Sequence, residues 1–232
     1  MLISGFQKLT LLDYPDHVAA LIFAQGCNFA CGYCHNPEMI PSFRILPVRP
    51  EFDPKWILSF LEKRKGLLDG VVISGGEPTL QENLPLFLQT IKDMGFLIKL
   101  DTNGSRPEIL SKLIDKKLLD YVAMDIKAPI KDYPNLVKNR NTKSLLDSIQ
   151  VIMNSQIDYE FRSTIFPSLH GIEEIKSMGK LIRGAKRWYL QNFRPLKTLD
   201  RSFKKQSSFS TESLLNLQSI ARHYACLVGI RG

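Results

Sequence analysis

The sequence predicts an α/β protein whose parallel strands form an incomplete (β/α)6 barrel, a partial TIM barrel. Three observations lead to this prediction. Short apolar runs alternate with amphipathic helical stretches along the 232 residues, about six such units fill the chain, and polar motifs follow the predicted strands. Regular alternation of strands and helices indicates a parallel sheet with right-handed crossovers. A closed barrel of eight units typically needs about 250 residues, so an incomplete barrel fits this length better.

The first units of the chain surround a long loop. Residues 18–24 form the longest uninterrupted apolar run and are predicted as a buried strand. The loop over 25–50 is rich in Gly, Pro, Cys and Asn, and long loops in compact domains usually carry function. A helix over 54–65 and a strand over 71–74 follow. The next helix is expected at 81–94, and the apolar residues on one of its faces are Leu84, Phe87, Leu88 and Ile91.

The same alternation continues to the end of the chain. The helix expected at 107–117 opens with a proline, and the helix at 142–153 aligns Leu145, Ile149 and Ile152. Residues 226–230 are a candidate for a short closing strand. The other expected strands are 97–100, 121–125, 159–165 and 188–190, and the other expected helices are 171–183 and 211–224.

The chain is expected to form one domain over 1–232, with a core at about 16–195 and a C-terminal helix and strand in 198–232, because no repeat or linker divides it. With 44% hydrophobic residues and a net charge of +8, the composition is globular and basic. The longest apolar run has seven residues, whereas a membrane span needs about 20. The first residues lack the pattern of a secretory signal, so we expect a cytoplasmic protein without membrane contact.

Polar motifs follow the carboxyl ends of successive predicted strands. In barrels and in open parallel sheets alike, ligands bind at this edge. The sequence therefore predicts that these motifs meet at one site. The motifs occupy 27–34, 74–78, 101–104, 125–127 and 191–194.

Cys27, Cys31 and Cys34 are spaced C-x-x-x-C-x-x-C in the loop after the first predicted strand. Three clustered cysteines indicate metal or redox chemistry in a reducing compartment. Iron-sulfur cubanes normally take four cysteines, so a triplet would leave one iron without a protein ligand. That open coordination position is where a substrate can bind.

Three other interpretations of these cysteines remain open. Residues 31–35 match C-x-x-C-H, the haem-attachment pattern, although that chemistry belongs to exported proteins. A structural zinc ion would need His35 or the distant Cys226 as a fourth ligand, and the usual pair of C-x-x-C motifs is absent. A thioredoxin-like dithiol would leave Cys27 unexplained.

The cysteine loop, with Tyr33 before its last cysteine, and the Ser74-Gly75-Gly76-Glu77-Pro78 motif together resemble the radical S-adenosylmethionine (AdoMet) superfamily. More narrowly, the chain resembles the anaerobic ribonucleoside-triphosphate reductase activating proteins from Ile3 to about Pro195. Asp16 departs from that pattern, where the family has glycine. The motifs that carry the narrower resemblance are ISGFQK at 3–8, LDYP at 12–15, QGCNF at 25–29, CHNP at 34–37, LDTNG at 100–104 and MDIK at 124–127.

The resemblance implies a radical AdoMet domain with a four-iron four-sulfur cluster on Cys27, Cys31 and Cys34. The free iron would chelate the amino and carboxylate groups of AdoMet. A one-electron cleavage would then yield a 5′-deoxyadenosyl radical, and the cofactors would carry this chemistry while the protein positions and shields them. The cofactor-binding residues that the resemblance implies are Tyr33, Gly75, Gly76, Glu77, Asp101, Asp125 and Lys127.

Each of these residues also has a purely structural interpretation. Glycines let a backbone approach a ligand closely, and we expect Gly76→Val to weaken AdoMet binding without loss of cluster iron. The Asn-Gly after Asp101 is by itself only a turn signal. Asp125 and Lys127 lie on the same face of their strand, where they would either contact the ligand or form an ion pair inside the barrel. Arg162 and Thr164 share a face in the same way, and their roles are left open.

The implied activity is generation of a glycyl radical on the anaerobic reductase, with a flavodoxin or ferredoxin as electron donor. The alternatives are activation of another glycyl-radical enzyme, or a radical reaction on a small molecule or an RNA base. No RNA-binding platform is evident, so nucleic acid is not an expected partner.

The remaining histidines and the fourth cysteine are expected to play no part in this chemistry. His17, His170 and His223 are expected on the surface or in loops, and Cys226 is expected as a buried apolar residue. Two basic segments, 138–143 and 201–205, are candidates for steering a partner.

Overall fold

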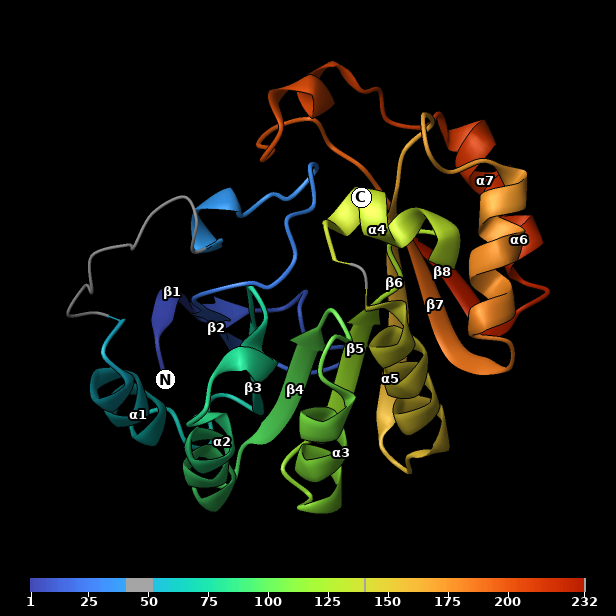
Figure 1. Ribbon diagram of the computed structural model, residues 1–232. Helices are drawn as coiled ribbons and strands as arrows, with labels where there is room; N and C mark the ends of the chain where they lie inside the picture. Colours follow the sequence, from blue (N-terminus) through green and yellow to red (C-terminus); the bar gives the residue numbers. More distant parts are fainter. Residues whose placement is uncertain (41–51, 140, 232) are drawn as a thin grey trace.

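The computed structural model describes residues 1–40, 52–139 and 141–231. Its centre is one curved sheet in which the eight strands lie side by side in sequence order (Figure 1). The strands are β1 (Ile3–Thr10), β2 (Ala19–Ala24), β3 (Gly70–Gly75), β4 (Leu97–Thr102), β5 (Tyr121–Asp125), β6 (Asp158–Ile165), β7 (Ala185–Asn192) and β8 (Ala225–Arg231).

Strands β2 to β8 are parallel, and only β1 runs antiparallel to its neighbour. Residues at the ends of successive parallel strands are paired: Ala24 lies opposite Gly75, and Ile165 lies opposite Asn192. The loops after these strands therefore meet at one edge. The sheet is a partial barrel, because β1 and β8 are its two outer strands.

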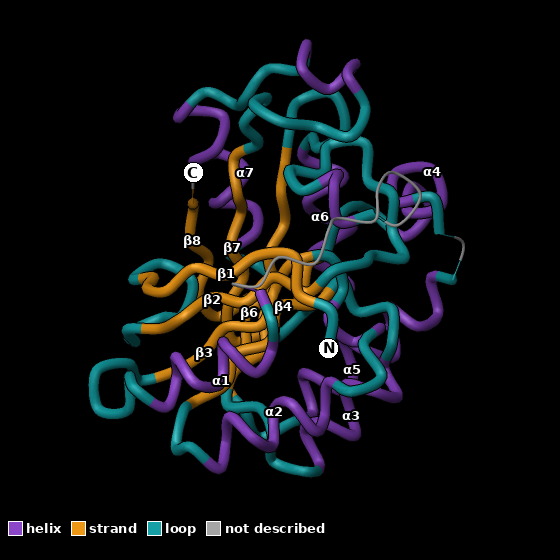
Figure 2. The backbone as a smooth tube through the Cα atoms, turned by 90° about the vertical axis from the view of Figure 1, so that its left-hand side faces the viewer, coloured by secondary structure: helices purple, strands orange, loops and turns teal. Residues whose placement is uncertain are grey.

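The helices pack against the convex face of the sheet, except α4 (Tyr133–Val137), which lies near the carboxyl ends of the strands (Figures 1 and 2). All except the short α4, which the sequence did not predict, begin and end close to their expected positions. The helices are α1 (Pro54–Glu62), α2 (Leu84–Asp93), α3 (Pro107–Asp115), α4 (Tyr133–Val137), α5 (Thr142–Asn154), α6 (Ile172–Leu181) and α7 (Thr211–Ala221), and the short 3-10 turns are η1 (Pro37–Met39), η3 (Pro78–Leu80), η4 (Ile130–Asp132) and η5 (Arg201–Lys205).

The main apolar core lies between the helices and the sheet. On α2, Leu84, Leu88 and Ile91 are fully buried, as the 3.6-residue period predicts. A second, smaller cluster fills the inside of the barrel at the amino ends of the strands, where the rings of Tyr14 and Tyr121 lie 6.0 Å apart. The carboxyl end of the barrel is thus the end left free for a ligand.

The predicted fold class is confirmed, with two additions to the six expected strands. Strand β1 was not expected, because its outward residues, half-exposed or exposed from Ser4 to Leu9, give no clear alternation. The candidate closing strand is present as β8. Asp16 adopts a positive φ of 63°, a conformation that glycine adopts without strain, which explains why the related family has glycine there.

Part of the long loop expected over 25–50 lies outside the described residues, and the part that is described contains η1. No helix among the described residues is long and apolar enough to cross a membrane.

Candidate functional site

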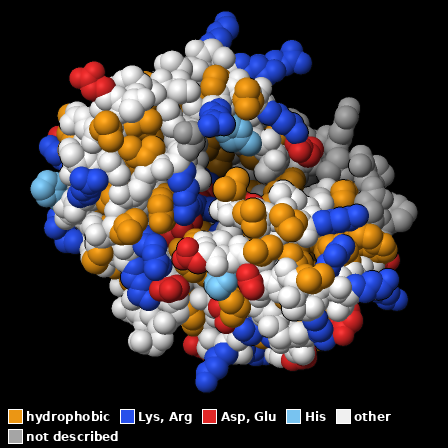
Figure 3. Space-filling model, turned by 180° about the vertical axis from the view of Figure 1, so that it is seen from behind, with side chains coloured by type: hydrophobic (Ala, Val, Ile, Leu, Met, Phe, Trp, Pro, Cys, Tyr) orange, Lys and Arg blue, Asp and Glu red, His pale blue; other side chains and the backbone are white. Residues whose placement is uncertain are grey.

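A cavity of about 220 Å³ lies at the carboxyl edge of the parallel strands. Loops after β2, β3, β4 and β5 and the inner face of β6 supply its walls. Seen from behind, the molecule has a hollow in the middle of its surface, with Lys and Arg side chains along its border (Figure 3). The predicted site residues that line the cavity are Cys27, Cys31, Tyr33, Cys34, Gly75, Gly76, Asp101, Asp125 and Lys127.

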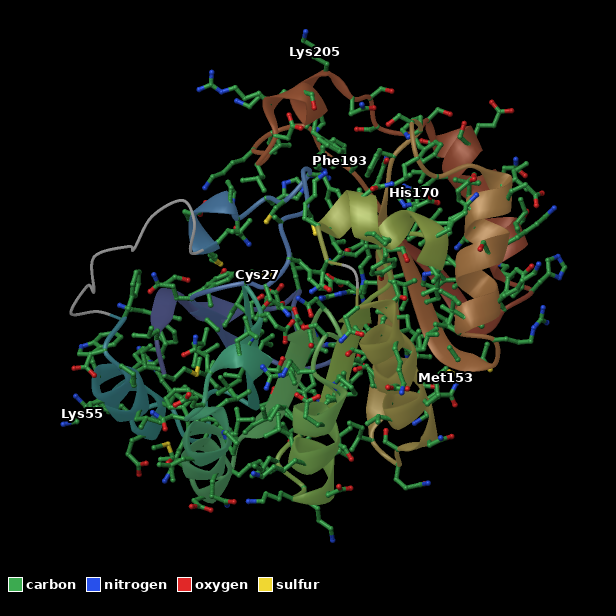
Figure 4. All side chains as sticks on the ribbon, viewed as in Figure 1. Cys27, Lys55, Met153, His170, Phe193 and Lys205 are labelled. Atoms are coloured by element: carbon green, nitrogen blue, oxygen red, sulfur yellow. The ribbon has the colours of Figure 1, made fainter. Side chains whose placement is uncertain are left out.

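The three cysteines lie on the loop after β2, and Figure 4 labels the first of them, Cys27, above the sheet. Cys31 is buried, and Cys27 and Cys34 are half-buried. Backbone hydrogen bonds fold the loop back on itself: the Cys34 N–H donates to the Cys31 carbonyl at 2.9 Å, and the Phe29 N–H lies 3.4 Å from Cys27 Sγ. All three side chains consequently face one cavity.

Burial raises the pKa of all three thiols. The Cys27 pKa is raised to about 12 and the Cys31 pKa to about 11, and the Cys34 pKa is raised as well. Without a metal the thiols therefore stay protonated near neutral pH. A metal or cluster that bound here would displace these protons, because thiolates are the ligands.

The geometry fits a cluster better than a single metal ion. Among the residues that the structure describes, no group of three or more His, Cys, Asp or Glu side chains could hold one metal ion. A tetrahedral zinc ion needs its ligands about 2.3 Å from a single point, whereas a cubane offers a separate iron to each thiolate. Cys226 is exposed on β8 and does not line the cavity, so it supplies no fourth ligand.

That position of Cys226 also corrects the expectation that it is a buried apolar residue. Strand β8 is an outer strand, and residues 226 and 227 on it are both exposed. An apolar sequence context alone did not distinguish an outer strand from a central one.

The Gly75-Gly76 turn packs directly against the cysteine loop. The Glu77 N–H donates to the Gly26 carbonyl at 2.7 Å, and the Gly76 N–H donates to Ala24 at 3.0 Å. Gly75 has a φ of +115°. A Cβ on Gly76 would lie 2.0 Å from the Gly26 oxygen and 3.2 Å from the Cys27 nitrogen. Glycine at 76 is thus required for the contact between the two loops as well as for the approach of a ligand.

Glu77 stands behind the cavity wall and does not line it. Its carboxylate is fully buried and accepts hydrogen bonds from the Asn103 N–H at 2.6 Å, from Thr102 Oγ1 at 2.8 Å and from the Thr79 N–H at 3.1 Å. The sequence-based prediction that Glu77 helps to bind AdoMet stays a prediction, and its carboxylate is not among the groups that line this cavity. Its carboxylate instead connects the turn after β3 to the loop after β4.

Five charged side chains form a network on the inner face of β4, β5 and β6. Arg162 bridges two carboxylates, donating to Asp101 and Asp125 at 3.0 Å each. Lys127 pairs with Asp125 at 2.9 Å, and Lys99 pairs with Asp101. Asp125 and Lys127 are therefore an ion pair and cavity-lining residues at once, so the two interpretations of these residues do not exclude each other.

The network keeps its members ionised. Burial alone would raise the pKa of each carboxyl, but the neighbouring cations outweigh it: the pKa of Asp125 is lowered to about 2 by Lys127 and Arg162, and that of Asp101 is lowered by Arg162 and Lys99. Burial would lower the Lys127 pKa, yet the nearby Asp125 raises it well above its ordinary value. The cavity wall thus presents both fixed negative and fixed positive charge to a zwitterionic ligand.

Two buried side chains hold the backbone of Lys127. Its N–H donates to the Tyr133 hydroxyl at 2.8 Å, and its carbonyl lies 3.0 Å from His170 Nε2. The Phe166 N–H donates to His170 Nδ1 at 3.2 Å, so Nδ1 is the unprotonated ring nitrogen. The Nε2–H of His170 therefore donates to the Lys127 carbonyl oxygen. His170 lies in the loop between β6 and α6, one of the two positions expected for it, but it is fully buried and not on the surface. No spacing in the sequence indicated this role, because Lys127 and His170 come from different units.

Asn103 connects the loop after β4 to the cysteine loop. Its side-chain nitrogen donates to the Asn28 side chain at 3.0 Å and lies 3.9 Å from Cys27 Sγ. Ser105 extends this contact, since its hydroxyl accepts from Asn28 at 2.9 Å. The Asn-Gly motif is thus more than a turn signal, because it fixes the first cysteine of the loop.

Tyr33 lines the cavity from within a group of aromatic rings. Its ring centroid lies 5.5 Å from that of Phe166, 6.4 Å from Phe193 and 6.1 Å from Phe203. Its buried hydroxyl has no hydrogen-bond partner among the described residues. Arg162 and Thr164, whose roles the sequence left open, also line the cavity. A ligand with an acceptor near Tyr33 would satisfy that hydroxyl.

Comparison with known proteins places these observations in a family. The model of the radical SAM superfamily matches residues 21–182. A protein of Methanocaldococcus jannaschii named "Putative glycyl-radical enzyme activating enzyme MJ1227" is 35% identical over 237 residues, which cover 99% of this chain and 95% of that protein. The pyruvate formate-lyase-activating enzyme of Clostridium pasteurianum is 27% identical over 187 residues, covering 78% of this chain and 76% of the enzyme.

Solved structures agree on the fold. A domain of a pyruvate-formate lyase-activating enzyme from Bacteroides vulgatus superposes with a TM-score of 0.59 at 19% identity, covering 70% of this chain and 99% of that domain. Radical SAM enzymes use a four-iron four-sulfur cluster and AdoMet. The chain belongs to the radical SAM superfamily and is a homologue of glycyl-radical enzyme activating enzymes.

Proposed function

We propose that this protein generates a glycyl radical on an anaerobic ribonucleoside-triphosphate reductase. The observation that carries the proposal is the meeting of the three-cysteine loop, the double-glycine turn and the charged network around one cavity. The sequence motifs of the reductase-activating family, from the ISGFQK segment to the MDIK segment, support this partner.

In this proposal Cys27, Cys31 and Cys34 hold three irons of the cluster, and the wall opposite them holds AdoMet. When bound, the two cofactors supply the 5′-deoxyadenosyl radical that removes a hydrogen atom from the partner's glycine. The backbone at Gly75 and Gly76 contacts the methionine amino end of AdoMet, and the charged network flanks it. The walls of the cavity exclude part of the water from the reaction, and the docked partner would exclude the rest.

An open barrel suits a protein substrate. Strands β1 and β8 are the outer strands of the sheet, so the barrel does not close around the cavity. A loop of a partner protein would fill that opening and complete the shielding of the site. A flavodoxin or a ferredoxin supplies the electron for each turnover.

The test is electron paramagnetic resonance on an anaerobic mixture of this protein, AdoMet, a reductant and the reductase. We expect a glycyl doublet that disappears when the radical glycine of the reductase is changed to Ala, and no doublet with the Cys31→Ala activase. A parallel mixture contains pyruvate formate-lyase, the enzyme that the Clostridium relative is named for.

The two mixtures distinguish the alternatives. A doublet with the lyase and none with the reductase would move the assignment to another glycyl-radical enzyme. Cleavage of AdoMet with no doublet in either mixture would favour a small molecule or an RNA base as the substrate.

A further inference from the structure

We propose that four exposed cations next to the cysteine loop form the docking surface for an acidic electron-donor protein. This basic surface consists of Lys138, Arg201, Lys204 and Lys205. The inference rests on the cluster of the proposed function, because the surface would deliver electrons to it. The sequence placed these residues in two separate basic segments, 138–143 and 201–205, and residue 140 lies outside the described residues.

The fold brings both basic segments to the same cysteine. The Ala30 N–H donates to the carbonyl of Val137, directly before Lys138, at 2.9 Å. The Asp200 N–H, directly before Arg201, donates to the carbonyl of Gly32 at 2.9 Å. Ala30 and Gly32 are the two neighbours of Cys31. One hydrogen bond on each side of this cysteine therefore connects it to one of the basic segments.

The second segment is held firmly against the loop. The ring of Phe203 in η5 packs so closely over Gly32 that a Cβ there would lie 2.5 Å from it. Earlier in the same connection, Lys197 forms an ion pair at 2.7 Å with Glu38, which follows the three cysteines in the sequence. Phe203 contacts the loop but does not line the cavity. The basic surface thus adjoins the cysteine loop from outside the cavity and leaves the cavity itself free for AdoMet and the glycine substrate.

The charges of this surface are available to a partner. All four side chains are exposed, and none forms an ion pair with another described residue. Asp200 is the one acidic residue in residues 193–205; hydrogen bonding from Ser202 lowers its pKa most, and the charge of nearby Lys138 lowers it further. A cluster of unpaired positive charge attracts a negatively charged protein and speeds its association at low salt.

The surface fits a protein better than a nucleic acid. Single-stranded nucleic acid binds where basic groups alternate with exposed aromatic rings on which the bases stack. The one aromatic residue of η5, Phe203, turns its ring inward to Tyr33, Phe166 and Phe193. We therefore assign the surface to an acidic protein that carries a flavin or an iron-sulfur centre.

The transfer itself is a single electron. The donor is oxidised by one electron, the cluster is reduced by one, and no bond forms or breaks in this step. The Cys31 side of the cluster is the side nearest to the docked donor, because Ala30 and Gly32 carry the connections to the surface.

The test compares two reductants on the cluster-loaded protein without any glycyl partner, with 5′-deoxyadenosine as the measured product. One reductant is a reduced acidic flavodoxin, and the other is dithionite, which needs no docking surface. For the Lys204→Glu/Lys205→Glu variant we expect a rate with flavodoxin that is roughly 5- to 10-fold lower at low salt, and an unchanged rate with dithionite. The wild-type rate with flavodoxin should fall as salt is added.

The matched control is Lys116→Glu/Lys117→Glu. These two lysines are also adjacent and exposed, but they follow α3 at the amino edge of the sheet. The same change of charge there should leave both rates unchanged.

Several results would overturn the proposal. An unchanged rate with flavodoxin in the Lys204→Glu/Lys205→Glu variant would show that the donor docks elsewhere. In a second assay that adds the reductase and uses dithionite as the reductant, a lower glycyl-radical yield of the variant would assign the surface to the glycyl partner. Binding of an RNA oligonucleotide that the variant loses, with the flavodoxin rate intact, would assign it to nucleic acid. If the wild-type protein cleaved no AdoMet with dithionite, the proposed cluster function would fail first, independently of docking.

Discussion

Arg162 is the residue on which the charged wall of the cavity depends. It donates to Asp101 and to Asp125, which come from two different strands, and so fixes the distance between them. A buried ion network contributes little net stability by itself, but removing one member leaves the others without compensation. We infer that the network serves to hold charge in a fixed position beside a zwitterionic ligand.

Asp125→Asn should reduce stability at neutral pH but not in strong acid. The folded-state pKa of Asp125 is about 2, below the ordinary value of about 3.9, so its carboxylate stabilises the fold above about pH 4. That contribution is lost as the pH falls through 2. We expect Asn to lower the free energy of unfolding by about 1–2 kcal/mol at pH 7, and the difference to vanish near pH 2.

Urea unfolding at several pH values measures this difference. The exposed Asp147→Asn on α5 is the control and should change stability little at any pH. A deficit in Asp125→Asn that stayed constant from pH 7 to pH 2 would contradict the role given to the charge.

Gly76→Ala should weaken the binding of both the cluster and AdoMet. The added Cβ would meet the Gly26 oxygen at 2.0 Å and crowd the Cys27 nitrogen, so the cysteine loop must shift. This revises the sequence-based expectation for Gly76→Val, in which cluster iron stayed in place. We expect lower iron content and at least about 10-fold weaker AdoMet binding, a loss of about 1.4 kcal/mol.

Gly171→Ala is the matched control, because a Cβ there meets only the flexible Glu174 side chain, at 3.1 Å. Iron analysis and equilibrium AdoMet binding measure both effects. Full iron content in Gly76→Ala would show that the two loops move independently.

At the scale of elements, apolar periodicity predicted the positions of most helices and of the central strands. It did not predict which strand–helix units contact one another. The helix α2 and the strand β5 lie where the sequence predicts them. Strand β1 gave no such pattern, because it pairs with β2 while most of its side chains stay partly exposed. The connection between β7 and α7 was equally unpredictable, since its partner, the cysteine loop, lies more than 150 residues away.

That connection yields a prediction for Phe203. Its ring covers Gly32 and contacts Tyr33, so Phe203→Ala should loosen the cysteine loop. We expect Phe203→Ala to lower the free energy of unfolding by about 2–3 kcal/mol. The visible absorbance of the cluster should also decay faster in air. Phe203→Leu should restore most of the protection because it refills the volume.

The decay is measured after anaerobic reconstitution, with iron content confirmed at the start. Equal decay rates for the wild-type protein and Phe203→Ala would show that η5 does not shield the loop. Slow decay in the Leu variant and fast decay in the Ala variant would assign the effect to packing.

At the scale of the whole molecule, the order of the strands explains why the sequence predicted so much of the site. Parallel strands bring their carboxyl ends to one edge, so motifs spread from residue 27 to residue 127 meet without any long-range signal. What the sequence could not supply was the direction of each side chain. Glu77 faces away from the cavity, and His170 supports Lys127 from behind, because both depend on neighbours from other units.

The central claim is that the three cysteines of this edge hold a cluster with an iron left free for AdoMet. Electron paramagnetic resonance of the reduced, reconstituted protein before and after AdoMet addition tests it most directly. We predict that AdoMet changes the cluster signal in the wild type and in Cys226→Ala, and that Cys31→Ala gives no such cluster. A cluster signal that persists in Cys31→Ala but is lost in Cys226→Ala, or one that AdoMet leaves unaltered in the wild type, would contradict the claim.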